Sequence, residues 1–321
     1  MKNTLNLLLK LCLNFDIIKK AKKIMVDGWI CLDKPKGVSS NFAMVKVRRI
    51  LGERTGYVGT LDPFATGVLP IAVGRARKFI QFIEDCVKIY EFEVVFGTST
   101  DSYDETGQIL QTTKIIPTKD QIEKVLPKFL GIIEQIPPKF SAIKINGRRA
   151  CDLVRQNKSV EIPSRKILIH DILLLNFSKN NTAKLRVKCS KGTYVRTLAI
   201  DIAQELGSLC YVKELKRIKS GFFSIDHAIT LEKLMEIVDT NKLDGNLFPL
   251  ESPLDDIPAL SLEKDLVSKL QSGQAVQLAG SEFFSSNVKL FDKESGKFCG
   301  VCFISADGVV TAVKMYLNLG D

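Results

Sequence analysis

Asp62 has the surroundings of a reactive carboxylate. Its loop contains glycines at positions 56, 59 and 67 and leads into an apolar run from Val68 to Val73. Pro63 biases Asp62 toward an extended conformation, and the glycines permit tight turns and close approach of a large ligand to the backbone. An Asp-Pro pair also occurs in many inert turns, but a carboxylate on a loop between rigid elements is a usual place for catalysis. The sequence therefore indicates Asp62 as a candidate catalytic residue.

Two tyrosines and an arginine form a second group of candidates. Tyr90 begins an alternating run from Lys88 to Gly97, which predicts a half-buried strand. Tyr194 and Arg196 share a face if the strand that begins near Leu185 continues through them. Taken alone, these patterns favour a core aromatic at position 90 and a surface ion contact at position 196.

Ordinary helix and strand signals surround these candidates. The expected helices run from Asn41 to Leu51, Ala76 to Glu84, Thr118 to about Leu126 and Thr197 to Leu206, and a buried strand is expected from Val68 to Val73. The basic stretch from Val212 to Phe223 predicts a helix end with Leu215 in the core. These elements would hold the candidate residues in place.

A proline-stiffened loop near residue 138 is followed by a basic turn. Lys144 ends the loop, and Arg148 and Arg149 lie in the turn. Basic turns usually face water, but beside an RNA site such side chains contact phosphates. We therefore retain these three residues as candidate substrate contacts.

Composition indicates an anionic partner. The 321 residues are enough for about two domains, and 46 Lys and Arg against 36 Asp and Glu give a net charge of +10. From Ala259 onward there are six Lys, no Arg and seven acidic residues, so the positive excess lies in the first 258 residues. This charge suits nucleic acid, although it does not separate RNA from DNA or from an acidic protein.

The cysteines and the N-terminus bear on location. Eight Cys occur without a framework spacing, which fits a reducing cytoplasm. Cys299 and Cys302 form a Cys-x-x-Cys pair within an apolar run, and only two His occur in the chain, so no metal site is expected. Residues 1–24 show no clean signal peptide or membrane span, and we expect them to be a disordered extension before the main domain.

A domain boundary is expected near residue 250, where three prolines punctuate a loop. The interpretation is a catalytic domain over residues 25–250 and a smaller module over residues 256–321. Asp307-Gly308 lies between two apolar runs and predicts a hairpin in the smaller module.

The stretch from Gly56 to Leu69 closely resembles the signature loop of the bacterial tRNA pseudouridine synthases of the TruB family, Gly-His-x-Gly-Thr-Leu-Asp-Pro-x-Ala-x-Gly-Val-Leu. Lys34-Pro35, Tyr90 and the stretch from Ser190 to Arg196 resemble further motifs of this family. The resemblance spans about residues 29 to 321. It implies an α+β fold with a mixed, largely antiparallel central sheet and a small C-terminal β-barrel domain of the PUA type.

The same resemblance implies an activity. The enzyme would isomerise uridine 55 in the T loop of tRNA to pseudouridine, by flipping the base, breaking its N-glycosidic bond and rejoining it through carbon. No redox change occurs, so no cofactor or metal is expected. The expected partner is the T arm of tRNA, and the expected state is a cytoplasmic monomer without a membrane or protein partner.

Residue roles follow from the resemblance. Asp62 would attack the sugar or the base, or abstract a proton in a glycal route, and the sequence does not choose between these routes. Arg196 would pair with Asp62 and favour its ionised form, and Tyr194 would assist proton transfer. Tyr90 would stack on the flipped base, and Leu215 would wall the base pocket.

One residue departs from the family pattern. Tyr57 occupies the position where the family usually has a His associated with base flipping and RNA docking. A tyrosine can stack and donate a hydrogen bond, but it cannot carry the charge of an imidazolium. We expect activity to survive this change, with a different grip on the T loop.

Two other classes of function remain open from the residues. A non-catalytic RNA-binding protein would explain the charge but would leave the Asp62 loop without a chemical purpose. A metal-dependent nuclease could use Asp62 with Asp101 and Asp104, which lie in an oxygen-rich turn whose spacing is not that of an EF-hand.

Overall fold

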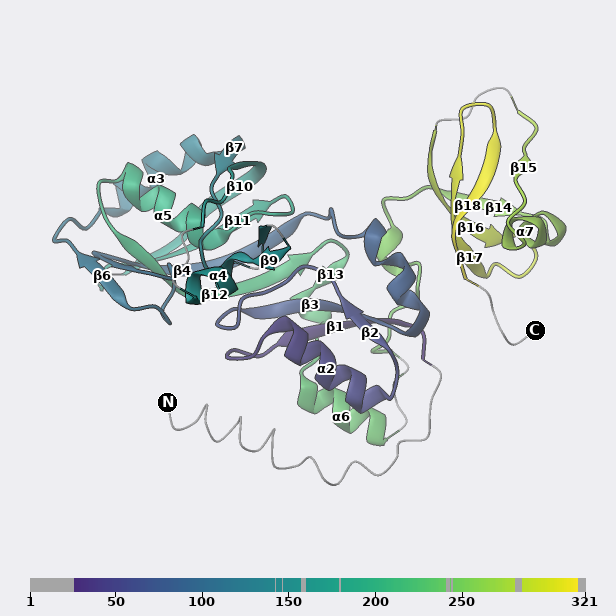
Figure 1. Ribbon diagram of the computed structural model, residues 1–321, viewed down its shortest axis with the longest axis horizontal. Coiled ribbons are helices and arrows are strands. Elements are labelled where there is room, and N and C mark those ends of the chain that lie inside the picture. Colours follow the sequence, from purple (N-terminus) through teal and green to yellow (C-terminus); the bar gives the residue numbers. More distant parts are fainter. Residues whose placement is uncertain are drawn as a thin grey trace.

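Two β-sheets form the framework of the protein. The computed structural model describes residues 26–141, 143–145, 147–156, 160–178, 180–240, 243, 245–280 and 285–316. The larger sheet is built from residues before 225 and the smaller one from residues after 258 (Figure 1). The expected extension over residues 1–24 lies outside the described residues.

The larger sheet is mixed and largely antiparallel, as expected. Its main order is β1-β3-β12-β4-β11-β10-β7, with β2 added to β3 and β13 added to β12. Only the β12–β3 pair is parallel among the described strands of this sheet. The strands are β1 (Gly28–Lys34), β2 (Thr55–Tyr57), β3 (Thr66–Val73), β4 (Lys88–Phe96), β7 (Gly131–Gln135), β10 (Arg165–Ser178), β11 (Thr182–Cys189), β12 (Cys210–Ser220) and β13 (Phe223–Ser224).

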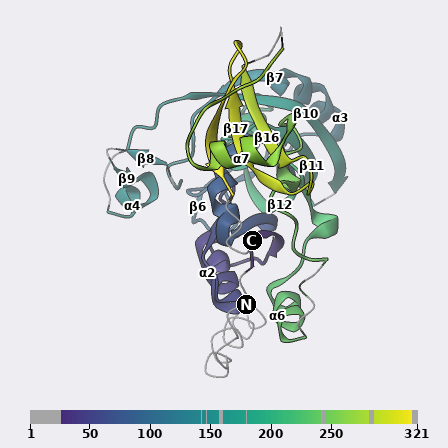
Figure 2. The ribbon, with the colours of Figure 1, turned by 90° about the vertical axis from the view of Figure 1, so that its right-hand side faces the viewer.

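Helices cover this sheet in two places. α2 (Ser40–Leu51) and α6 (Leu231–Asp239) lie side by side at one end of the molecule, and α3 (Lys119–Val125) lies at the other (Figure 2). α5 (Val195–Glu205) packs with α3 over an apolar cluster that includes Phe92 of β4. α4 (Ala150–Arg155) is a short helix next to the basic turn.

Capping residues define the ends of α2 and α3. Ser39 caps α2 by accepting a hydrogen bond from the amide of Phe42, and Gly52 ends the helix with φ 70°. Thr118 and Gln121 form a reciprocal capping box at the start of α3. These local bonds fix where the helices begin and end.

Three expectations about secondary structure are wrong in detail. Residues Gly74–Phe82 form a helix of the 3₁₀ type, η2, which begins and ends two residues before the helix expected over residues 76–84. The basic stretch around Leu215 belongs to strand β12. Two bulges interrupt its alternation, so that its buried residues Val212, Leu215, Arg217 and Ser220 are spaced by three, two and three positions. Arg196 lies in the first turn of α5, so it does not continue a strand with Tyr194.

Short hairpins surround the larger sheet. β5 (Thr98–Thr100) pairs with β6 (Ile109–Thr112), and β8 (Lys144–Ile145) pairs with β9 (Arg148–Arg149). The loop between β5 and β6 contains Tyr103, which has a positive φ of 64°. Such backbone is unusual for a residue other than glycine and is maintained by surrounding contacts.

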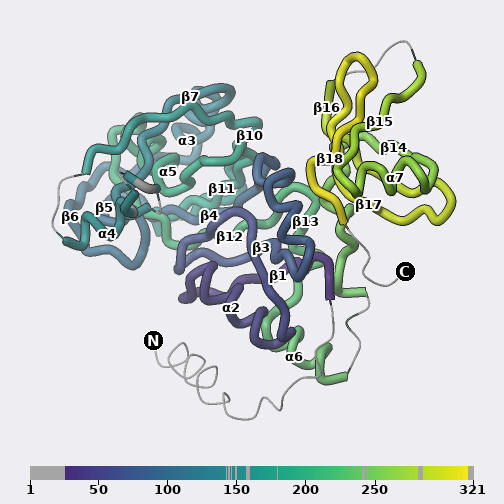
Figure 3. Tube along the Cα trace, turned by 45° about the vertical axis from the view of Figure 1, so that its right-hand side comes forward, coloured from purple at the N-terminus to yellow at the C-terminus, as the bar shows by residue number. Residues whose placement is uncertain are grey.

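The C-terminal part is a small β domain, as expected. Its sheet has the order β14-β16-β17-β18-β15 and stands apart from the larger sheet, with β13 near the connection (Figure 3). The predicted hairpin around Asp307-Gly308 joins β17 to β18. The elements are β14 (Ala259–Leu262), α7 (Lys264–Gln271), β15 (Val276–Gln277), β16 (Ser286–Asp292), β17 (Phe298–Ile304) and β18 (Val309–Met315).

Direct contacts join the two parts of the chain. Arg75 of η2 donates to Asp27 at 2.6 Å and to the hydroxyl of Tyr316 at 2.9 Å, and its guanidinium lies 4.1 Å from the Tyr316 ring centre. Phe79 of η2 meets Phe298 of β17 edge to face, with ring centres 5.4 Å apart. The C-terminal domain is therefore packed on the segment that follows β3.

Asp201 provides a test of the packing of α5. Burial raises the pKa of this carboxyl to about 6, and no basic side chain of the described residues opposes the effect. A raised pKa means that the neutral form stabilises the fold below about pH 4, and that this stability is lost as the pH rises through 6. We expect Asp201→Asn to raise the unfolding free energy at pH 8 by about 1 kcal/mol, after allowance for solvent screening.

The measurement is thermal unfolding at several pH values. The melting temperature of Asp201→Asn should exceed that of the wild type by about 2 °C at pH 8, and the gap should close toward pH 4.5. Asp256→Asn, at an exposed carboxyl in the linker, is the control and should show no such trend. A constant gap across the pH range would contradict the assignment.

Candidate active site

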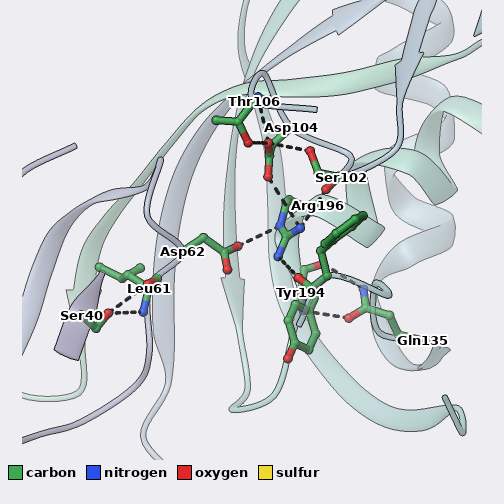
Figure 4. Close-up of polar contacts among 10 residues, drawn as sticks. Ser40, Leu61, Asp62, Ser102, Asp104, Thr106, Gln135, Tyr194 and Arg196 are labelled. Atoms are coloured by element: carbon green, nitrogen blue, oxygen red, sulfur yellow. Dashed lines mark hydrogen bonds and ion pairs between the residues drawn. The ribbon is translucent and has the colours of Figure 1, made fainter. Parts of the chain in front are cut away.

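Asp62 and Arg196 meet although 134 residues separate them. Arg196 Nε donates to Asp62 Oδ2 at 2.8 Å (Figure 4). Asp62 lies in the loop between β2 and β3, and Arg196 lies in the first turn of α5. The arginine side chain is 3% exposed and the aspartate side chain 29%. The carboxylate is therefore held by a buried cation on one side and open to a substrate on the other.

The guanidinium of Arg196 is fixed by three more groups. Nη1 donates to the carbonyl of Ser102 at 2.8 Å, and Nη2 donates to the carbonyl of Phe140 at 3.0 Å. Asp104 Oδ2 lies 3.6 Å from Nη1. Since a guanidinium presents its donors in a rigid plane, these contacts define the direction from which it approaches Asp62.

Asp104, which the sequence offered only within the nuclease alternative, contacts Arg196. Its Oδ1 accepts hydrogen bonds from the hydroxyls of Ser102 and Thr106 and from the amide of Thr106. Asp62 and Asp104 do converge, as the nuclease alternative required, but they converge on the guanidinium of Arg196. The acidic turn after β5 was the only signal in the sequence for this contact.

Opposing effects act on the pKa of Asp62. Burial raises this pKa, the charge and hydrogen bond of Arg196 lower it, the nearby Asp104 raises it and Lys34 lowers it. Burial is the largest effect, so the pKa lies above its ordinary value. The expected influence of Arg196 is present, yet it only partly offsets the cost of removing the carboxylate from water.

Lys34 forms hydrogen bonds with the backbone next to Asp62. Its buried ammonium donates to the carbonyls of Val38 at 2.7 Å and Pro35 at 3.0 Å, and reaches the carbonyl of Pro63 at 3.4 Å. The amide of Gly37 donates to the same Pro63 carbonyl at 2.8 Å. Burial lowers the pKa of Lys34 to about 8. The turn after β1 thus holds the residue that follows Asp62.

Arg217 links the two ends of the Asp62 loop through hydrogen bonds to their backbone. Arg217 was not identified as a site residue from the sequence. Its fully buried guanidinium donates to the carbonyls of Gly59 and Val68, each at 2.7 Å. Gly59 has φ 70°, and a Cβ there would lie 2.8 Å from Arg217 Nη1. A glycine is required at position 59 for both reasons.

Tyr90 and Leu215 pack against the loop that carries Asp62. Both are buried in one apolar cluster, which also contains Leu61 and Phe64 of the loop. Tyr90 of β4 pairs with Arg217 of β12, and Leu215 of β12 pairs with Phe92, two residues further along β4. Burial raises the pKa of the Tyr90 hydroxyl, and Arg217 opposes this effect. The structure thus packs both candidates against Leu61 and Phe64, the apolar residues on either side of Asp62 and Pro63.

Tyr194 is close to Arg196 in sequence but is directed elsewhere. It occupies the N-cap position of α5, and its ring lies against Arg165, whose guanidinium carbon is 4.7 Å from the ring centre. In Figure 4, Tyr194 and Asp104 lie on opposite sides of Arg196. The shared face with Arg196 that a strand would give is therefore absent.

The remaining candidates are more dispersed. Tyr57 ends β2 and is half-buried against the apolar cluster beneath α2. Arg148 is exposed on the β8–β9 hairpin. The side chains of Lys144 and Arg149 lie outside the described part of the chain. Neither Tyr57 nor Arg148 is among the described residues that bond to the Asp62–Arg196 pair.

The described residues contain neither a cluster of metal-binding side chains nor a membrane-spanning helix. No group of three or more His, Cys, Asp or Glu side chains in this part of the chain could hold a metal ion. Within the same residues, no helix has both the length and the apolar character needed to cross a bilayer.

Three family models match consecutive parts of the chain. They are "TruB family pseudouridylate synthase (N terminal domain)" over residues 48–195, "tRNA pseudouridylate synthase B C-terminal domain" over 196–255 and "Pseudouridine synthase II TruB, C-terminal" over 258–315. The first model contains the Asp62 loop, and the second begins at Arg196.

Similar proteins and structures agree with this assignment. A Caulobacter vibrioides protein named tRNA pseudouridine synthase B is 41% identical over 81% of this chain and 84% of its own length. An Ehrlichia ruminantium protein of the same name is 39% identical over 91% of this chain and 96% of its own length.

Solved structures show the same fold. A chain of the "Crystal Structure of a Cbf5-Nop10-Gar1 Complex" superposes with a TM-score of 0.69 at 24% identity, covering 90% of this chain and 85% of that one. A chain of an H/ACA RNP bound to a substrate RNA containing 2'-deoxyuridine gives a TM-score of 0.70 at 21% identity, covering 91% and 86%. With its matching models and relatives, the chain belongs to the TruB family of pseudouridine synthases.

Proposed function

We propose that the protein converts uridine 55 in the T loop of tRNA to pseudouridine. The observation that carries this proposal is the partly exposed Asp62 carboxylate held by the buried Arg196, in a chain 41% identical to a tRNA pseudouridine synthase B. The reaction is an isomerisation. The bond from C1′ to N1 breaks, a bond from C1′ to C5 forms, the C5 proton leaves and N1 gains a proton.

Asp62 is the proposed catalytic group. Its open side can reach the ribose or the base of a flipped nucleotide, and its ionised form is required whether it attacks a carbon or abstracts a proton. Arg196 orients this carboxylate through the bond at 2.8 Å. The raised pKa of Asp62 keeps it a stronger base than an ordinary aspartate.

Tyr90, Leu215 and Tyr194 are proposed to contact the nucleotide. Tyr90 and Leu215 pack against Leu61 and Phe64 of the Asp62 loop, and an aromatic face and an apolar wall there would replace the stacking that a flipped base loses. Access to Tyr90 requires a small movement of the loop above it, because this ring is buried. Tyr194, at the start of α5, would contact the substrate from the other side of Arg196.

The remaining RNA contacts are proposed on charge and position. Tyr57, Lys144, Arg148 and Arg149 are assigned to the T arm, and the net charge of +10 favours a polyanion. We propose a catalytic domain over residues 25–250 and a PUA-like domain over residues 256–321, acting as a monomer in the cytoplasm. The packing of η2 against β17 supports a fixed placement of the second domain.

The test uses unmodified tRNA labelled with tritium at C5 of uridine. The purified protein, without added metal, should release one tritium per tRNA, and tRNA with cytidine at position 55 should release none. Binding of tRNA without release would support the RNA-binding alternative. Strand cleavage that a chelator abolishes would support the nuclease alternative.

A further inference from the structure

Ser40 holds the residue immediately before Asp62. It is the first residue of α2 and is 1% exposed. Its hydroxyl accepts a hydrogen bond from the amide of Leu61 at 2.8 Å and donates one to the carbonyl of Leu61 at 2.9 Å (Figure 4). One side chain therefore satisfies both polar backbone groups of the residue that precedes the carboxylate.

Gln135 makes the same kind of contact on the other side of the ion pair. It is the last residue of β7 and is 1% exposed. Its Oε1 accepts from the amide of Tyr194 at 2.8 Å, and its Nε2 donates to the carbonyl of Tyr194 at 3.1 Å. The Tyr194 side chain makes no capping hydrogen bond with α5. Gln135 thus fixes the start of the helix whose first turn carries Arg196.

We propose that Ser40 and Gln135 are positioning residues that set the geometry between the Asp62 carboxylate and the Arg196 guanidinium. Each holds the backbone on one side of the ion pair, from a different element, through a pair of reciprocal hydrogen bonds. This inference rests on the proposed function, because it concerns the rate of that reaction.

Removing a buried hydroxyl or amide side chain leaves its backbone partners without a hydrogen bond, and the backbone then shifts to find new partners. Without the Ser40 hydroxyl, the amide and carbonyl of Leu61 would be left unpaired in a residue that is only 3% exposed, and the loop would move to satisfy them. A displacement of about 1 Å at a reacting group costs about 100-fold in rate. The effect should therefore appear in the chemical step before it appears in RNA binding.

The first experiment compares Ser40→Ala with Ser39→Ala. Ser39 is the exposed cap of α2 and accepts from the amide of Phe42, so its loss weakens the same helix without touching the Asp62 loop. In single-turnover tritium release, Ser40→Ala should be slower by about 10- to 100-fold, with its tRNA dissociation constant within about twofold of the wild type. Ser39→Ala should match the wild type in both.

The pH profile separates positioning from general loss of stability. The charged groups that face Asp62 are Arg196 from α5, Asp104 from the loop after β5 and Lys34 from the end of β1. If the loop moves away from Arg196, the carboxylate loses the contact that lowers its pKa, and the acid limb of the rate should shift upward by about one pH unit. Ser39→Ala should leave that limb in place.

Gln135→Met tests the second residue with Gln121→Met as its matched control. Gln121 also bonds to a backbone amide, that of Thr118 in the capping box of α3. Gln135→Met should slow the reaction and shift the acid limb in the same direction as Ser40→Ala, and Gln121→Met should do neither. If Ser40→Ala does not fold, Ser40→Cys keeps the size of the side chain with much weaker hydrogen bonds and should show the same two effects.

Three outcomes would overturn the inference. The first is a wild-type rate and pH profile in both Ser40→Ala and Gln135→Met. The second is an equal loss in the Ser39 and Gln121 controls. The third is a change confined to tRNA affinity. Absence of product from the wild type would instead defeat the proposed function, which distinguishes the two failures.

Discussion

Asp62→Asn is expected to abolish pseudouridine formation while leaving tRNA binding intact. The amide has nearly the shape of the carboxylate and can still accept a hydrogen bond from Arg196, but it neither attacks carbon nor takes a proton at neutral pH. Removal of a central catalytic group costs at least about 10⁴-fold in rate. Single-turnover release of tritium from C5-labelled tRNA measures this loss, and filter binding measures the affinity.

Asp101→Asn is the matched control for this change. Asp101 lies in the exposed turn after β5, where its carboxylate accepts from the amide of Gln108. It carries the same substitution at a carboxyl that the nuclease alternative invoked, and it should retain the wild-type rate. Turnover by Asp62→Asn within tenfold of the wild type would show that another group performs the chemistry.

Replacing Arg196 should give the second largest effect. Arg196→Met removes the cation from a buried pair and leaves Asp62 and Asp104 facing each other, so the rate should fall by about 10³-fold. Loss of one partner of a buried pair also costs about 3–5 kcal/mol of stability. Arg196→Lys keeps the charge but loses the planar set of donors, and a smaller fall of about 100-fold is expected.

The pH dependence distinguishes the charge of Arg196 from its shape. The reaction requires ionised Asp62, so its rate rises with pH through the pKa of this group. Arg196 lowers that pKa, which burial has raised. Arg196→Met should therefore move the acid limb to higher pH, and Arg196→Lys should move it less. Arg186→Met, at a surface arginine paired with Glu91, is the control; an unshifted limb in Arg196→Met would contradict the assignment.

Local patterns predicted much of the fold. The strand that starts with Lys88 alternates over its whole length, and Ser39 and Thr118 cap the helices that follow them. Both signals lie within a few residues, so the sequence contains them directly. The stretch around Leu215 was mistaken for a helix because two bulges convert the period of β12 from two to a mixture of two and three.

Long-range contacts explain why part of the site was missed. The sequence indicated Asp62 and Arg196 through motifs, but nothing near Ser40 shows that its hydroxyl meets Leu61, 21 residues later. Gln135 reaches Tyr194 across 59 residues, because β7 is brought beside the start of α5. The contact of Asp104 with Arg196 likewise depends on the packing of the turn after β5 beside α5. Such partners are set by tertiary structure, and no local pattern specifies them.

The two domains share an apolar core, so the chain cannot be cut between them without exposing part of it. Phe291, Phe298 and Val301 of the C-terminal domain share one apolar cluster with Trp29 and Phe79 of the larger domain. A truncation after residue 255 would therefore remove part of the core on which β1 and η2 rest, and would expose aromatic surface to solvent. The two sheets can be drawn as separate domains, yet the larger one is not a complete folding unit when it is cut from the smaller.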